Sequence, residues 1–313
     1  LDRWTQDDYH GLAAVFAGLV RGQEVQFVGR GEVTHPRTGV AAIPKIPGNR
    51  FLNAAADPRQ DFAAWVINSD NPYFAKAIIA RVWESLMGRG LVTPVDDLRA
   101  TNPASHPKLF NRLAENFVQN DFKLKPLIRQ ICASAAYQRS SRVEGDRVDD
   151  AELLRKFYAV ANVKPLSAEV LSDAIRDVTN VPDEAAGSVR AIQVVDRSSL
   201  AEKLQFLGQC LPGETCSTDP AAQRGITSKL HLMNGDLLNV QIRDPRCRLQ
   251  TMLQNGTSTD AIVDKFYRRA LGRNPSRLED TTWADRLSGA DHKERCEDFL
   301  WALLNCQEFT TNQ

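Results

Sequence analysis

Helix-forming signals recur along most of this chain, and they constrain its fold more than any other feature. Side chains that cap helices stand one or two residues before a proline or before an apolar-spaced segment. These capping candidates are Asp57, Asn71, Ser105 and Ser167. The apolar stripe after Asn71 has helical spacing and consists of Phe74, Ile78, Val82 and Leu86. The pattern predicts a mainly α-helical fold, a multi-helix orthogonal bundle.

The N-terminal part carries a different pattern. Residues 1–22 have the signals of a helix, with Thr5 or Asp7 as its cap. Residues 24–43 alternate apolar and polar side chains around the turn-forming sequence Pro-Arg-Thr-Gly, which predicts one small β-hairpin near the N-terminus. Further along, the run AIQVV at residues 191–195 has the composition of a strand.

These patterns suggest a division of the chain. Residues 1–56 form a helix plus the hairpin, and residues 57–313 form the helical domain. Within that domain a C-terminal helical subdomain is expected from about residue 257. The chain begins at Leu1 without a signal peptide, so we expect a fragment or a processed product.

The balance of charge excludes two classes of partner. Lys plus Arg and Asp plus Glu each number 39, so the formal net charge is zero. Such a chain has no basic surface for nucleic acid or for an anionic membrane. No apolar run approaches the roughly 20 residues that a transmembrane helix needs. We therefore expect no nucleic-acid partner and no transmembrane segment.

The six cysteines do not have the spacing of metal ligands. None forms a CxxC pair or a cluster with histidine, so no metal site is predicted. Cys210 and Cys216 flank the turn sequence LPGET and are close enough in sequence to form a disulfide in an oxidising compartment. Cys132 and Cys306 lie among apolar residues, which is typical of buried thiols.

The segment VDDLRATNPASHP is the strongest candidate for a catalytic site. Asp96 and Asp97 offer carboxylates for acid–base chemistry, with Arg99 and His106 as partners. The structural alternative is favoured, because adjacent side chains of an extended loop point to opposite faces. It predicts that one aspartate pairs with Arg81, Arg89 or Arg99, while the other accepts backbone N–H groups.

Two further groups of side chains have a functional and a structural interpretation. Tryptophan rings could stack on carbohydrate, but at helical spacing among apolar residues they are expected in the core, with Trp83 and Trp301 as the clearest cases. The arginines of FYRRALGR could bind an acidic partner. The simpler interpretation of Arg268, Arg269 and Arg273 is that they complement a helix dipole and keep one face solvated.

Several segments resemble the C-terminal domain of the planctomycete cytochrome-c-associated family, which has no established activity. They are residues 71–141, starting NPYFAKAII, and residues 165–181, 230–239, 266–280 and 301–309. Residues 4–16, WTQDDYHGLAAVF, look like the tail of the preceding domain of that family. Two positions depart from the family pattern: Ala80 replaces an Asn, and CLPGETC replaces more closely spaced cysteines.

The resemblance implies an exported protein of the periplasm or cell envelope. In that family a CxxCH haem-attachment motif lies just upstream of such a tail. This chain has no CxxCH, so we expect no cofactor on it, and any c-type haem belongs to an upstream region or a partner chain. The resemblance places His10 near that motif, as a haem ligand or pocket residue; a surface or packed histidine is the simpler interpretation.

Three functions follow from these observations. The first is a non-catalytic helical module that holds a protein partner or packs against the upstream haem domain. The resemblance of the C-terminal segment to helical modules of secreted proteins, and distantly to phycobilisome linker domains, favours it. The second is an enzyme acting on a carbohydrate or sulfated polysaccharide, with Asp96, Asp97, Arg99 and His106 around a pocket. The third is an electron-transfer subunit with His10 near a haem.

Overall fold

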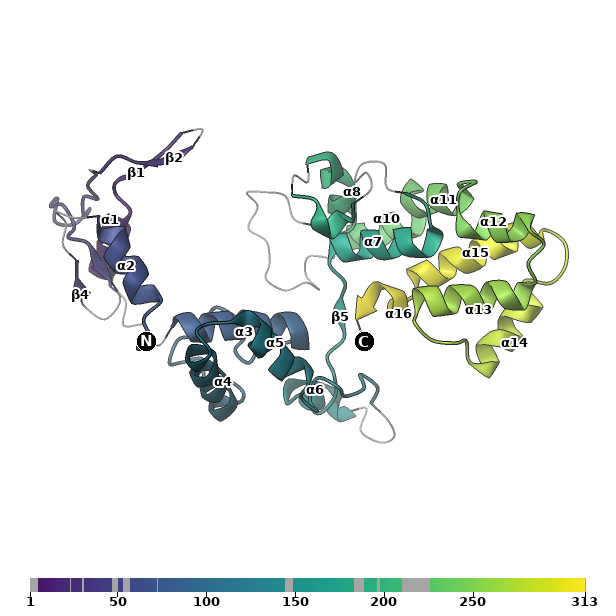
Figure 1. Cartoon of the computed structure of the whole chain (residues 1–313), viewed down its shortest axis with the longest axis horizontal. Helices are drawn as coiled ribbons and strands as arrows, with labels where there is room; N and C mark the ends of the chain where they lie inside the picture. The colour runs from purple at the N-terminus through teal and green to yellow at the C-terminus, as the bar shows by residue number, and fades with distance from the viewer. Residues whose placement is uncertain are drawn as a thin grey trace. The chain divides into compact units, whose positions relative to one another are not determined.

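The computed structural model describes residues 5–22, 24–29, 31–46, 50–52, 57–71, 73–143, 149–182, 189–195, 198–209 and 226–312. Helices make up most of these residues and the strands are only two or three residues long, so the predicted mainly α-helical class is confirmed (Figure 1). None of the helices in these stretches has the length and hydropathy needed to cross a lipid bilayer.

The chain divides into two compact units. The first is Leu1–Arg139 with Asp149–Ala159, and the second is Ser140–Val148 with Val160–Gln313. The chain therefore passes from one unit to the other after Arg139, after Val148 and after Ala159. The domain boundaries expected at residues 57 and 257 stay predictions.

The first unit begins with helix α1 (Gln6–Val15), which Thr5 caps as predicted. The Thr5 hydroxyl accepts from the backbone N–H of Asp8, and the Asp8 carboxylate accepts from the backbone N–H of Thr5. The prediction of a helix through residue 22 is wrong, because Leu19–Arg21 forms strand β1. Helix α1 ends at Val15 with Phe16 as its C-cap. A Cβ on Gly18, just before β1, would lie 2.5 Å from the Phe27 ring.

Short antiparallel ladders follow α1. Strand β1 pairs with β2 (Val25–Phe27), and β3 (Lys45–Ile46) pairs with β4 (Arg50–Phe51). A hairpin near the N-terminus is thus present; β2 lies within the predicted residues 24–43, but its partner β1 precedes them. At the predicted turn the structure has a single bridge, between Thr34 and Ala41.

After α1, the helices of the first unit are α2 (Pro58–Val66), α3 (Phe74–Met87), α4 (Pro107–Gln119), α5 (Leu124–Cys132) and α6 (Ala151–Lys156). Phe62 and Trp65 of α2 pack on a small cluster of Val15, Ile46 and Leu52, whereas α3, α4 and α5 form the larger core. Helix α3 packs against α4 and α5. Its buried face includes Ile79 and Trp83, which meet Phe110, Leu113 and Ile131.

The capping predictions for these helices have mixed outcomes. Asp57 caps α2 through the backbone N–H of Arg59, as predicted. The Asn71 side chain accepts from the backbone N–H groups of Tyr73, the N-cap of α3, and of Phe74, its first residue. The prediction that Ser105 caps α4 is wrong, because its backbone N–H and its hydroxyl both donate to the carbonyl oxygen of Leu91. His106 takes the N-cap position instead.

The second unit is a helical bundle. Its longer helices are α7 (Ala168–Thr179), α10 (Ile226–Asn234), α11 (Asp236–Arg243), α13 (Thr259–Ala270), α14 (Arg277–Arg286) and α15 (His292–Asn305). Its shorter elements are β5 (Lys164–Pro165), η2 (Ala191–Gln193), η3 (Ser198–Leu200), α8 (Ala201–Phe206), α12 (Arg248–Gln254), α16 (Gln307–Thr310) and β6 (Thr311–Asn312).

Ser167 caps α7 as predicted. The strand predicted at residues 191–195 is wrong: Asp173 accepts from the backbone N–H groups of Ala191 and Ile192, which starts a 3₁₀ turn.

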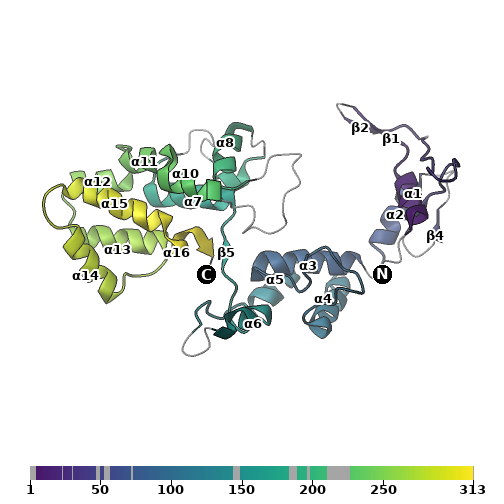
Figure 2. The same ribbon diagram turned by 180° about the vertical axis from the view of Figure 1, so that it is seen from behind.

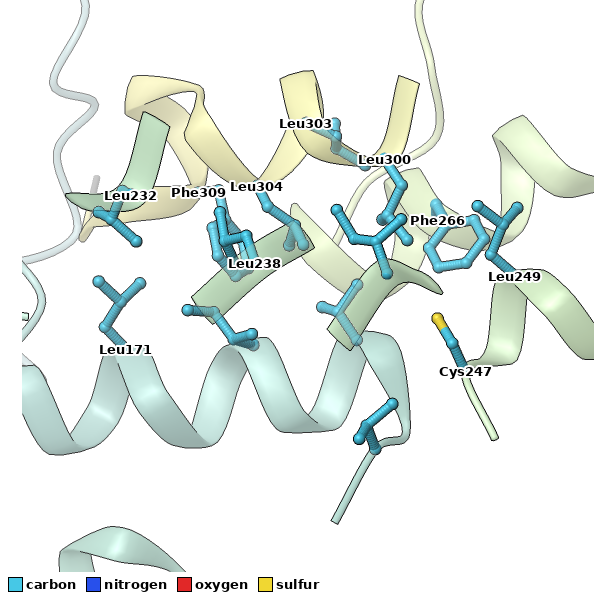
Figure 3. Close-up of a cluster of buried hydrophobic side chains, with 14 of the residues drawn as sticks. Leu171, Leu232, Leu238, Cys247, Leu249, Phe266, Leu300, Leu303, Leu304 and Phe309 are labelled. Carbon is cyan, nitrogen blue, oxygen red and sulfur yellow. The ribbon is translucent and has the colours of Figure 1, made fainter. Parts of the chain in front are cut away.

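One hydrophobic core fills the second unit. Helix α15 contacts α11, α12 and α13, and α13 also contacts α7; the views from front and back agree on this packing (Figures 1 and 2). Apolar side chains of these helices point toward one another, among them Leu171, Leu238, Phe266, Leu300 and Leu304 (Figure 3). Each of these five is fully buried.

The cysteines of the described residues are free thiols. They are Cys132, Cys247, Cys296 and Cys306. Cys132 and Cys306 are half-buried rather than fully buried. Burial raises the pKa of the Cys296 thiol to about 11. Cys210 and Cys216 lie outside the described residues, and their bridge stays a prediction.

Candidate functional site

The candidate loop starts where α3 ends. Gly88 closes α3 in the left-handed conformation, with φ of 72°, which glycine adopts without strain. A Cβ on Gly90 would lie 2.2 Å from the carbonyl oxygen of Val92, so only glycine fits the turn. The buried Tyr158 hydroxyl lies 2.8 Å from the Gly90 carbonyl oxygen and 3.1 Å from that of Arg89. This end of α3 is thus held by its own backbone and by one buried hydroxyl.

Asp96 pairs with the preceding helix. Arg81 Nε donates to Asp96 Oδ1 at 2.8 Å, and Arg81 Nη2 donates to Asp96 Oδ2 at 3.0 Å. These hydrogen bonds lower the pKa of Asp96. The pairing agrees with the structural interpretation of the loop, which named Arg81 among the possible partners.

Asp97 closes a turn inside the loop. Arg99 Nη2 donates to Asp97 Oδ2 at 2.7 Å, and the backbone N–H of Arg99 lies 3.4 Å from Asp97 Oδ1. Hydrogen bonding by Arg99 lowers the pKa of Asp97. Asn102 adds a second closure, because its amide donates to the carbonyl oxygens of Thr93 and Asp97 at 3.2 and 3.0 Å.

His106 has an aromatic environment. Its ring centroid lies 5.7 Å from that of Phe157 and 5.6 Å from that of Tyr158. Its Nδ1 is 3.2 Å from the hydroxyl oxygen of Ser105. The ring therefore packs between the loop and the residues after α6.

Of the four candidate side chains, Asp97 and Arg99 pair with each other, whereas Asp96 and His106 have partners outside this group. Asp96 faces Arg81, Asp97 faces Arg99, and His106 faces aromatic rings. Carboxylates with lowered pKa stay ionised at neutral pH and are poor general acids. The arrangement suits a loop that joins α3 to α4. A catalytic role for Asp96, Asp97, Arg99 and His106 stays a prediction.

His10 lies in a separate cluster on α1. Its Nδ1 is buried and has no hydrogen-bond partner. Its ring centroid is 4.7 Å from that of His35, which is only 5% exposed. His35 Nε2 lies 2.9 Å from Asp7 Oδ1 without the geometry of a hydrogen bond. Across the described part of the chain, no group of three or more His, Cys, Asp or Glu side chains is arranged to hold a metal ion.

Exposed apolar side chains are concentrated near the N-terminus. They are Tyr9, Phe16, Val20, Val25, Phe27, Val28, Val40, Ile43 and Phe51, which we call the N-terminal apolar set. Several of them lie on β1 and β2. In the described structure these strands pair only with each other, so each has an outer edge that no described strand covers. Hydropathy patterns alone missed this set, because strands that alternate apolar and polar residues usually bury one face.

The structure changes the predictions made for Arg273 and for Trp301. Arg273 does more than complement a helix dipole, because its guanidinium pairs with both Glu279 and Glu308. Trp83 is in the core as expected, with 4% of its surface exposed. Trp301 is only partly buried and lines a pocket on the second unit.

Comparison with known proteins gives one match. The sequence profile of a protein family of unknown function, PSD1 (DUF1553), matches residues 58–287. Curated proteins and solved structures contain no significant match to the chain.

Proposed function

Because the chain belongs to the PSD1 family of proteins of unknown function (DUF1553), we propose that it is a non-catalytic helical interaction module. We place it in an exported, cytochrome-c-associated planctomycete protein of the periplasm or cell envelope. Its function is to hold a protein partner, or to pack against a c-type haem domain that lies upstream or on a partner chain.

The N-terminal apolar set carries this proposal. Val25, Val28 and Ile43 are each more than half exposed, on a segment that precedes the family match at residue 58. Clusters of exposed apolar side chains mark protein interaction sites more often than isolated ones do. The uncovered edges of β1 and β2 add backbone donors and acceptors with which a partner strand can pair.

The contacts of the candidate loop favour an interaction module over a carbohydrate-active enzyme. Asp96, Asp97 and Arg99 are engaged in ion pairs, and His106 is packed on aromatic rings. We assign any haem to another segment, because the chain lacks CxxCH and the His10 ring is packed between Tyr9 and His35. The residues around His10 therefore do not fit a haem site.

The test is purification of the native full-length protein with its partner. Val25→Lys should reduce the amount of co-purified partner at least about tenfold, because it places a charge on the proposed contact surface. Val240→Lys is the matched control, since Val25 is 65% exposed and Val240, on α11, is 62% exposed. Equal recovery of the partner with both variants, or a native protein without any partner, contradicts the proposal.

A further inference from the structure

A pocket of about 280 Å³ opens on the second unit, where α10, α11 and α15 meet. Its lining combines an indole, two carboxylates, a guanidinium, an amide and two aliphatic side chains. These residues are Met233, Asn239, Ile242, Arg243, Glu297, Asp298 and Trp301. The volume is at the lower limit of ligand sites, roughly 300–1,000 Å³, and suits a ligand of one ring.

Glu297 is held in place by a buried amide. The Gln250 side chain, whose residue is 5% exposed, donates to Glu297 Oε1 at 2.8 Å and to the Ile242 carbonyl oxygen at 3.0 Å. The Glu297 side chain is 12% exposed, and its Oε2 lies 3.4 Å from Arg243 Nε. A carboxylate oriented in this way is a preorganised acceptor on the pocket wall.

Trp301 gives the pocket a fixed aromatic wall. Its indole Nε1 donates to the carbonyl oxygen of Met233 at 3.2 Å, which orients the ring. The rest of the side chain packs against the core of the unit. A rigid indole provides an apolar contact surface at a low cost in conformational entropy.

The charges around the pocket are balanced. The Glu297 carboxylate pairs with the guanidinium of Arg243, the Lys293 ammonium lies 3.9 Å from Glu297 Oε1, and Asp298 adds a second carboxylate to the lining. A charged ligand would meet a like charge from one of these groups, so the lining favours a neutral ligand. Carboxylates, an amide and a guanidinium together supply hydrogen-bond acceptors and donors at short spacing.

We propose that this pocket binds one neutral pyranose ring, free or at the end of a glycan. The hydroxyl groups of such a ring both donate and accept, which matches Glu297, Asp298, Asn239 and Arg243. The C–H face of the ring matches the indole of Trp301. The proposal concerns a ligand site on the second unit and is independent of the N-terminal apolar set.

The test is saturation-transfer NMR and titration calorimetry on the full chain. The probes are methyl glucoside, methyl galactoside and methyl N-acetylglucosaminide, with glucuronate and glucosamine as charged analogues of the same ring. A neutral oligosaccharide distinguishes a glycan end from a free sugar. At least one neutral probe should bind, and more tightly than both charged analogues. Absence of binding by every neutral probe, or tighter binding of a charged one, overturns the proposal.

Variants locate the site. Trp301→Ala should weaken binding of the best probe roughly tenfold through loss of ring contact. Asn239→Ala, a smaller change at a half-buried position, tests the same pocket if Trp301→Ala fails to fold. Trp65→Ala, at a partly buried tryptophan of the first unit, is the matched control and should bind as the wild type does. Unchanged binding in a folded Trp301 or Asn239 variant also overturns the proposal.

Discussion

At the scale of single residues, Arg273 pairs with two carboxylates at once. Its guanidinium donates to Glu308 Oε1 at 2.6 Å and Oε2 at 2.8 Å, and to Glu279 Oε1 at 2.9 Å and Oε2 at 2.8 Å. It therefore ties the turn before α14 to the short helix α16. Hydrogen bonding to Arg273 lowers the pKa of Glu279 to about 2 and also lowers that of Glu308.

We predict that Arg273→Met lowers the free energy of unfolding of the chain. The substitution leaves two partly buried carboxylates without their donor, and hydrogen bonds to charged groups contribute about 1.5–3 kcal/mol each in favourable sites. Urea unfolding measures the change. Arg268→Met is the control, because its side chain is 61% exposed and its pair with Asp264 lies along the helix surface; exposed pairs contribute only about 0–1 kcal/mol. An equal effect of the two substitutions would contradict this role.

The ion pairs of Arg273 with Glu279 and Glu308 make the free energy of unfolding depend on pH. The folded pKa of Glu279 is depressed from its ordinary 4.5 to about 2, so the unfolded chain binds the proton more readily. The contribution is present above pH 4.5 and is lost as the pH falls toward 2. Glu279→Gln should lower stability at pH 7 and flatten its decline in this window. Thermal unfolding at successive pH values measures the slope, and a slope unchanged from the wild type would argue against the assignment.

At the scale of elements, features set by residues close in sequence could be predicted. Features that depend on contacts with distant residues could not. The caps Thr5, Asp57 and Ser167 were found because a capping side chain and the backbone N–H group that donates to it lie within three residues. Ser105 was assigned wrongly, since its partner is the Leu91 carbonyl oxygen, fourteen residues back. The strand expected at residue 191 is a 3₁₀ turn for the same reason, because Asp173 binds its backbone.

In the candidate sites too, partners close in sequence could be predicted and distant partners could not. Arg81 was named as a partner of Asp96 because a helix end and the next turn lie close in sequence. The Arg273 network was missed, since Glu308 is 35 residues further on. Trp301 was expected in the core, because helical spacing does not distinguish a core position from the rim of a pocket.

Helix ends provide a test at this scale. Gly272 follows α13 with φ of 68° and has nothing within 4 Å of a Cβ, so Gly272→Ala introduces backbone strain alone, about 1–2 kcal/mol. At Gly90 a Cβ meets the Val92 carbonyl oxygen at 2.2 Å, so the turn itself must shift. We predict that Gly90→Ala destabilises the chain more than Gly272→Ala does in matched urea titrations. The reverse order would show that the turn after α3 tolerates a side chain.

At the scale of the whole molecule, each unit has its own core and a different kind of candidate surface. The first unit carries the N-terminal apolar set, and the second carries the pocket lined by Trp301. The equal numbers of acidic and basic residues give neither surface long-range attraction to a charged partner. Both proposals therefore rely on apolar contact and on hydrogen bonding at short range.

The most direct test of the central claim compares stability and partner binding in two variants of the native full-length protein. Asp97→Ala removes the Arg99 ion pair, so we predict a lower melting temperature and an unchanged affinity for the co-purified partner. Val25→Lys alters an exposed side chain, so we predict an unchanged melting temperature and at least about tenfold weaker binding. If Asp97→Ala instead leaves the melting temperature unchanged and abolishes binding or an activity, the loop is a functional site and the account is wrong.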